Sequence, residues 1–179
     1  VNIPASYALS LWKKCMELGK NFNITPYGTE AMHVLRAEKG YIIVGQETDG
    51  SVTPIDLDLN WIVSKKKYDF VGKRALNRSD TVKEDRKQLV GILTEDPSIV
   101  LEEGSHLVEF ETSLPMPMVG HITSSYYSPN LGRSIALGLV KSGTKKKGTK
   151  LIVPTVGKSI KVEITSPVFI DPENERLFA

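Results

Sequence analysis

The chain has 179 residues, of which 40% are apolar and 25% are charged, so it can bury a core and is not expected to be disordered. Its formal net charge of +2 does not favour a nucleic-acid partner, because such proteins concentrate Lys and Arg on one face. No apolar run is long enough for a membrane-spanning helix. The single cysteine, Cys15, favours a reducing compartment, and we therefore expect a cytoplasmic protein.

Two helices are predicted in the first 40 residues. Apolar residues between Ala5 and Leu18 recur at helical spacing, which predicts a helix that buries one face and ends at Gly19. A second helix is predicted from Thr29, whose hydroxyl can accept hydrogen bonds at the helix start, to Gly40. The start of the chain, Val1-Asn2-Ile3-Pro4, is typical of a strand end, so we expect the chain to have been cut from a longer one.

The next segment mixes short elements with a long loop. We predict a short strand at 41–44, a loop at 45–60, a strand at 61–63 and a short helix at 69–76 that Asp69 caps. Residues 77–87 are polar and strongly charged, without an apolar period, and predict a linker with a domain boundary.

The remainder of the chain is typical of an all-β domain. Strand-like runs separated by Gly- and Pro-containing turns occur at 88–93, 105–110, 118–126, 134–140, 150–153 and 158–164. Such a series predicts an antiparallel barrel or sandwich.

Few side chains suggest chemistry. The histidines, His33, His106 and His121, lie in different elements without metal-ligand spacing, so no metal site is predicted. Arg36 could hold an anionic ligand group through its planar guanidinium, or it could form a structural ion pair. Trp61 could form an aromatic wall for a heterocyclic ligand, or it could pack in a core.

A polar strand end, residues 124–127 (Ser-Ser-Tyr-Tyr), could line the edge of a ligand cavity or form a hydrogen-bonded corner of a barrel. No nucleophile turn, phosphate-binding loop or dinucleotide fingerprint occurs in the sequence, and no catalytic residue is predicted.

Several short segments follow one another in an order typical of one family. They are residues 35–41, 45–49, 53–54, 59–61 and 69–76 in the first half, and 89–92, 120–124, 128–132, 135–138 and 167–169 in the second. The pattern resembles the glycine-cleavage T-protein (aminomethyltransferase) family over essentially the whole chain. Within that family, residues 32–46, 93–97 and 169–173 are most similar to alpha subunits of heterotetrameric sarcosine oxidases.

The resemblance implies an α+β fold. A partial folate-binding α/β domain is expected over residues 1–80, followed by a small antiparallel β-barrel over residues 81–179. It also implies that the N-methyl group of sarcosine is oxidised to an imine at a flavin. The imine then reaches tetrahydrofolate, giving glycine and 5,10-methylenetetrahydrofolate, and oxygen reoxidises the flavin with formation of hydrogen peroxide.

The same resemblance implies cofactors and partners. Tetrahydrofolate is the expected cofactor of this region, with FAD, FMN and NAD in other parts of the parent enzyme. The expected partners are the N-terminal remainder of the alpha subunit, a flavin-bearing beta subunit and the small subunits of the heterotetramer. The family's acid/base aspartate and its pterin-binding tyrosine and glutamate fall before Val1, so the chain alone is expected to be inactive.

Four residues are expected to contact the cofactor: Val1, Asn2, Arg36 and Trp61. Met32 stands where many aminomethyltransferases carry an Arg that helps to hold the folate, so the anionic folate tail is expected to be held differently here.

Three alternatives stay open at this point. The chain could belong to an aminomethyltransferase, or it could be a non-catalytic module that binds folate or a partner. A small RNA-binding barrel is a weaker reading, because the lysine runs lack nearby aromatic platforms apart from Tyr68.

Overall fold

The computed structural model describes residues 1–177, and it divides into two compact units. The first unit, Val1–Met32, contains the 3-10 turn η1 (Ala5–Tyr7), helix α1 (Ala8–Leu18) and a second 3-10 turn, η2 (Gly19–Phe22). The predicted helix and its end before Gly19 are confirmed. The predicted buried face is not: no α1 residue is buried, and Trp12 and Leu18 are 56% and 59% exposed.

Helix α2 (Thr29–Glu38) confirms the second predicted helix. The backbone leaves the helix through Gly40, whose φ of +72° is one that L side chains rarely adopt. The glycine is also needed for space, because a Cβ at position 40 would lie 2.6 Å from the carbonyl oxygen of Pro167.

The two short strands predicted between residues 41 and 63 are wrong. At 43–47 the chain turns, because the amides of Gln46 and Glu47 both donate to the Ile43 carbonyl. At 61–63 the chain forms the 3-10 turn η3 (Asn60–Ile62), in which the Ile62 amide donates to the Leu59 carbonyl. In both places a local turn uses the backbone groups that a strand would need for pairing.

The predicted helix at 69–76 is also largely wrong. The Asp69 carboxylate accepts a hydrogen bond only from the adjacent Phe70 amide, at 3.0 Å, whereas a cap would accept from an amide two or three residues on. Gly72 then takes a φ of +92°, which stops a regular helix, and only the 3-10 turn η4 (Ala75–Asn77) follows.

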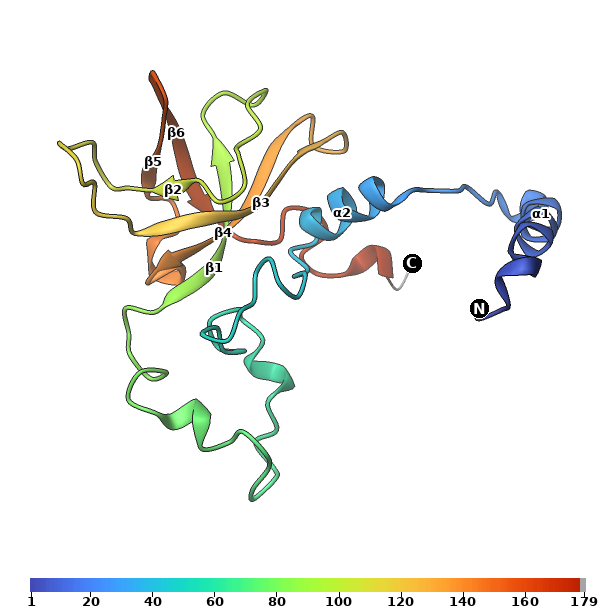
Figure 1. Cartoon of the computed structure of the whole chain (residues 1–179), viewed down its shortest axis with the longest axis horizontal. Coiled ribbons are helices and arrows are strands. Elements are labelled where there is room, and N and C mark those ends of the chain that lie inside the picture. The colour runs from blue at the N-terminus through green and yellow to red at the C-terminus, as the bar shows by residue number, and fades with distance from the viewer. Residues whose placement is uncertain (178–179) are drawn as a thin grey trace. The chain divides into compact units, whose positions relative to one another are not determined.

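Six antiparallel strands form a barrel in the second unit, which starts at His33 (Figure 1). They are β1 (Lys87–Thr94), β2 (His106–Leu107), β3 (Gly120–Ser128), β4 (Arg133–Lys141), β5 (Lys150–Thr155) and β6 (Lys158–Thr165), in the order β2-β3-β4-β1-β6-β5. Val108 and Ile152 exchange two backbone hydrogen bonds of 2.9 Å, which join the β2 and β5 edges and close the sheet. The structure therefore selects the barrel from the two predicted all-β architectures.

The barrel interior is filled by alternate residues of its strands. On β1, Val90 and Ile92 point inward and belong to the main apolar cluster. The other members of this cluster are Leu101, Leu107, Ile122, Ala136, Val140, Leu151, Val153, Ile160, Val162 and Ile164. The turns η5 (Gly143–Lys146) and η6 (Glu175–Leu177) complete the described elements.

A second apolar cluster lies on the opposite face of β1 and β4. Leu89, Leu137 and Leu139 point outward there and pack with Leu57. Partly buried residues of the long loop and of the C-terminal segment cover this cluster, namely Ile42, Val52, Leu59 and Phe169. The segment between residues 42 and 59 is thus a packed layer on the barrel rather than a free loop.

A buried ion pair fixes this layer to the barrel. Arg86 donates to the Asp56 carboxylate from Nε at 2.8 Å and from Nη2 at 2.5 Å, and the Thr53 amide and hydroxyl both donate to it at 2.8 Å. Burial alone would raise the pKa of Asp56, but the bonds from Arg86 and Thr53 outweigh it and hold that pKa below its usual 3.8. The Asp56 carbonyl accepts from the Leu89 amide at 2.7 Å.

Asp56 is expected to make stability depend on acid pH. Since its folded-state pKa is lowered, the stabilisation is present above the unfolded-state pKa and is lost as the pH falls through the folded-state value. Between about pH 5 and pH 3, the urea midpoint of the wild type should fall more steeply than that of Asp56→Asn. Parallel curves for the two proteins would contradict this assignment.

Within residues 1–177, no helix combines the length and the apolar character that crossing a bilayer requires.

Candidate functional site

The C-terminal turn of α2 carries Arg36 into a polar network on strand β3. Its Nη1 donates to the Tyr41 carbonyl and to the Glu47 carboxylate, both at 3.1 Å. Its Nη2 donates to the hydroxyls of Ser124 at 2.6 Å and Tyr126 at 3.2 Å. A further acceptor of Nη2 is the Gln46 side-chain oxygen at 3.1 Å. The guanidinium therefore links the helix, the following turn and the barrel.

Glu47 is the anionic centre of this network and is 0% exposed. Besides Arg36, the Ile43 amide donates to its carboxylate at 2.8 Å and the Ser124 hydroxyl donates at 2.5 Å. A buried carboxylate is tolerated only when a cation and hydrogen-bond donors compensate it. Here both are present, so the turn at 43–47 forms around the charge of Glu47.

Aromatic rings border the guanidinium. The Arg36 Cζ lies 5.6 Å from the centroid of the Tyr126 ring, a distance suited to a cation–π interaction. The His33 ring lies 6.4 Å from the Tyr126 ring in a tilted arrangement. The Arg36 guanidinium is thus held by hydrogen bonds at its edge and by the Tyr126 ring across its face.

Glu38, two residues after Arg36, makes a second buried attachment of α2. Its carboxylate accepts from the Ser128 hydroxyl at 2.5 Å and from the Asn130 side-chain amide at 2.9 Å. Its backbone carbonyl accepts from the amides of Phe169 and Ile170 at 2.9 and 3.0 Å. Together, Arg36 and Glu38 fix the end of α2 to strand β3, to the turn that follows it and to the segment after β6.

The guanidinium of Arg36 is engaged mainly by groups of the protein itself. Both Nη atoms of Arg36 are occupied by protein acceptors, and its Nε is buried without a protein partner. The ion pair that the sequence left open for Arg36 is therefore present, with Glu47 as its partner. That Arg36 also contacts a cofactor stays a prediction. Of the polar residues at the end of β3, Ser124 and Tyr126 accept hydrogen bonds from Arg36. The Ser125 hydroxyl instead accepts from the Leu101 amide.

The other predicted cofactor contacts are exposed. Val1 and Asn2 lie at the exposed start of the first unit. Trp61 lies in η3 and is 79% exposed, so it is not packed in a core. A hollow of about 410 Å³ adjoins η3, and its lining is mostly apolar: Pro54, Ile62, Val63, Ser64, Lys67, Phe70, Val71, Gly72 and Leu76.

Glu47, like the neighbouring Gln46, is a member of the network that sequence reasoning missed. It stands 11 positions after Arg36, and helix α2 ends between the two residues, so no continuous element connects them. The one available signal was a charged residue two positions after Gly45, which ends a short apolar run. The turn at 43–47 gives the reason for a carboxylate at this position, because it places Glu47 beside the Ile43 amide and the Arg36 guanidinium.

Residues 1–177 contain no group of three or more His, Cys, Asp or Glu side chains that could hold a metal ion. His121 instead lies 3.4 Å from the Lys87 ammonium through Nδ1, and its strand partner is His106. Burial, reinforced by Lys87 and His106, lowers the pKa of His121 and favours its neutral form.

Two family models match the chain. Residues 1–67 match the GCVT N-terminal domain, and residues 87–171 match the glycine cleavage T-protein C-terminal barrel domain. The second match coincides with the barrel strands from β1 to β6.

Similar proteins come from two enzyme groups. The chain is 50% identical over 98% of its length to a sarcosine oxidase subunit alpha of Corynebacterium sp. (strain P-1), and 49% identical to that of strain U-96. It is 36% identical to an aminomethyltransferase of Thermotoga neapolitana over 92% of its length. The chain spans 18% of the length of the two sarcosine oxidase subunits and 43% of that aminomethyltransferase.

A solved structure shares the arrangement. The glycine cleavage system aminomethyltransferase T from Bartonella henselae aligns with a TM-score of 0.77 and 26% identity, covering 94% of this chain and 45% of that one. This similarity and the two domain matches bear out the predicted α+β fold with its small antiparallel barrel. The chain therefore belongs to the glycine cleavage T-protein family.

Proposed function

We propose that this chain is the folate-side part of a sarcosine oxidase alpha subunit. The observation that carries the proposal is the identity of 40–50% with sarcosine oxidase alpha subunits over 98% of the chain, against 29–36% with aminomethyltransferases. The parent enzyme oxidises sarcosine and passes the one-carbon unit to tetrahydrofolate. The products are glycine, 5,10-methylenetetrahydrofolate and hydrogen peroxide.

In this proposal the chain shapes a folate site and carries no catalytic residue. The exposed indole of Trp61 and the apolar hollow beside η3 fit the flat heterocycle of a folate. Arg36 fits a supporting role better than a direct one, since both Nη atoms already have acceptors. With Met32 in place of an Arg, other groups would hold the folate carboxylates. Val1 and Asn2 remain proposed contacts.

The domains at residues 1–80 and 81–179 are likewise proposed, with the border in the linker before β1. FAD, FMN and NAD would be bound by other parts of the parent enzyme. The partners would be the rest of the alpha subunit, a flavin-bearing beta subunit and the small subunits. The exposed free thiol of Cys15 is consistent with a cytoplasmic location.

The test is an assay of the full-length polypeptide that carries this sequence, purified with its co-purifying subunits. Sarcosine is expected to yield hydrogen peroxide, and added tetrahydrofolate is expected to convert the released one-carbon unit to 5,10-methylenetetrahydrofolate. The absence of sarcosine-dependent peroxide would overturn the proposal in favour of an aminomethyltransferase. The 179-residue chain alone is expected to form neither product.

Replacing Trp61 tests the folate contact separately. In the same preparation, Trp61→Ala should weaken tetrahydrofolate binding about tenfold, because a stacked aromatic ring is lost. Peroxide formation without folate should be unchanged. Tyr68→Ala removes another aromatic side chain, 96% exposed, and is the matched control. Equal folate affinity in the wild type and Trp61→Ala would remove Trp61 from the site.

A further inference from the structure

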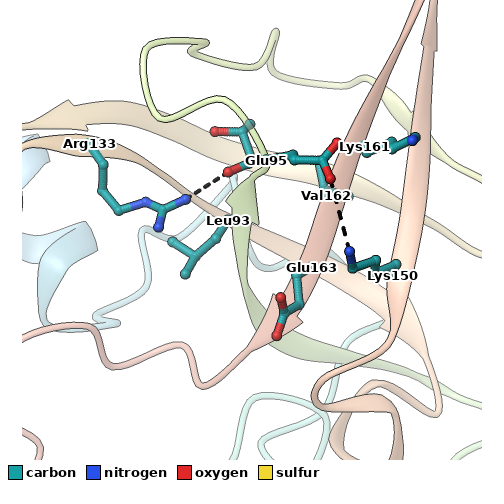
Figure 2. Close-up of a pocket in the computed structure, with 8 residues that line it drawn as sticks. Leu93, Glu95, Arg133, Lys150, Lys161, Val162 and Glu163 are labelled. Atoms are coloured by element: carbon teal, nitrogen blue, oxygen red, sulfur yellow. Dashed lines mark hydrogen bonds and ion pairs between the residues drawn. The ribbon is translucent and has the colours of Figure 1, made fainter.

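A charged hollow of about 250 Å³ lies on the barrel and shares no lining residue with the Arg36 network or with the hollow beside η3. Figure 2 shows Arg133 and Lys150 approaching it from opposite sides, with Glu95 between them. Its lining comes from four strands and consists of Leu93, Thr94, Glu95, Arg133, Lys150, Lys161, Val162 and Glu163. The function proposed above does not use any of these residues.

The strand register explains why both signs of charge meet here. Glu163 of β6 is paired with Leu93 of β1 on one side and with Lys150 of β5 on the other. Paired residues share a face of the sheet. The neighbouring residue Val162 is buried in the barrel core, so Glu163 and its partners point outward. The Glu95 amide donates to the Lys161 carbonyl at 3.0 Å, which places a second row of opposite charges beside the first.

The charges in the hollow are incompletely compensated. The Lys150 ammonium is 4.0 Å from the Glu95 carboxylate, which is the limit of an ion pair. Among residues 1–177, Arg133, Lys161 and Glu163 have no ion-pair partner. Arg133 is nevertheless held in place, because its Nη2 donates to the Thr94 carbonyl at 2.7 Å. Its Nε is buried and has no protein acceptor.

We propose that this hollow binds a small zwitterionic amino acid. The ligand carboxylate would lie against Arg133, its ammonium group against Glu163, and its short carbon skeleton against Leu93. An anion such as phosphate would leave the Glu163 carboxylate without a partner, and a simple amine would leave Arg133 without one. A ligand with one charge of each sign matches the lining. The inference is independent of the proposed sarcosine oxidation.

The test is a titration of the isotope-labelled whole chain with glycine, followed through backbone amide NMR signals. Glycine should shift the signals of residues 93–95 and 161–163 in a saturable way. Acetate and methylammonium each carry only one of the two charged groups of glycine. Each should bind about tenfold more weakly, because one charge-assisted contact is missing. Acetate or phosphate binding as tightly as glycine would overturn the proposal.

Variants separate binding at the hollow from effects on folding. Arg133→Gln and Glu163→Gln should each weaken glycine binding about tenfold, since each removes one charged contact. Arg133→Gln also removes the bond to Thr94, whereas Glu163 has no side-chain hydrogen bond in the described part, so Glu163→Gln tests the ligand contact alone. Lys158→Gln, outside this lining, is the control and should bind like the wild type. Unchanged glycine affinity in Glu163→Gln, or no saturable shift in the wild type, would overturn the proposal.

Discussion

Replacing Glu47 with alanine is expected to lower the free energy of unfolding by about 3–5 kcal/mol. The substitution leaves the Arg36 guanidinium, whose side chain is 9% exposed, without its carboxylate partner. It also leaves the Ser124 hydroxyl and the Ile43 amide without their shared acceptor. A buried charge that has lost its partner costs far more than the intact pair contributes, because its desolvation is no longer compensated.

The measurement is urea unfolding of the whole chain, followed by circular dichroism. Glu84→Ala is the matched control, since it breaks the Lys145–Glu84 pair, whose side chains are 68% and 88% exposed. An exposed pair contributes little to stability, so this variant should unfold almost like the wild type. If Glu47→Ala and Glu84→Ala unfolded at the same urea concentration, the Arg36–Glu47 pair would not hold α2 and the 43–47 turn to the barrel.

The second large effect is expected at Gly91, in the middle of β1. Alanine there should lower the free energy of unfolding by about 3 kcal/mol or more, because it overpacks a site that cannot relax easily. A Cβ would lie 2.1 Å from the carbonyl oxygen of Ser166 and 2.9 Å from the Phe169 ring. The Ser166 oxygen belongs to the backbone, so the segment 166–169 would have to move away from β1 and from the second apolar cluster.

Thermal unfolding of Gly91→Ala and Gly50→Ala provides the comparison. Gly50 has no neighbour within 4 Å of an added Cβ, so alanine should change stability there by no more than about 0.5 kcal/mol. Loss of Phe169 packing should accompany the destabilisation of Gly91→Ala, visible as shifted side-chain NMR signals. A Gly91→Ala protein as stable as Gly50→Ala would show that residues 166–169 are not fixed against β1.

Much of the fold could be predicted from residue patterns. The apolar spacing in 5–18 and the helix-start signal at Thr29 predicted α1 and α2, and the strand-like run at 88–93 predicted β1 as part of an all-β domain. These elements are determined locally, since the period of the side chains matches the period of the backbone. The motifs spread along the chain likewise indicated the family, which the domain matches bear out.

The tertiary structure decided what local patterns could not. The runs at 41–44 and 61–63 have strand-like composition, but local turns use their backbone groups instead. Closure of the sheet through Val108 and Ile152 makes the domain a barrel and not a sandwich. Local patterns could not indicate this closure, because the two residues that exchange hydrogen bonds are 44 positions apart. The role of Arg36 was decided by acceptors 5 to 90 residues away, and no short-range period can indicate contacts of that kind.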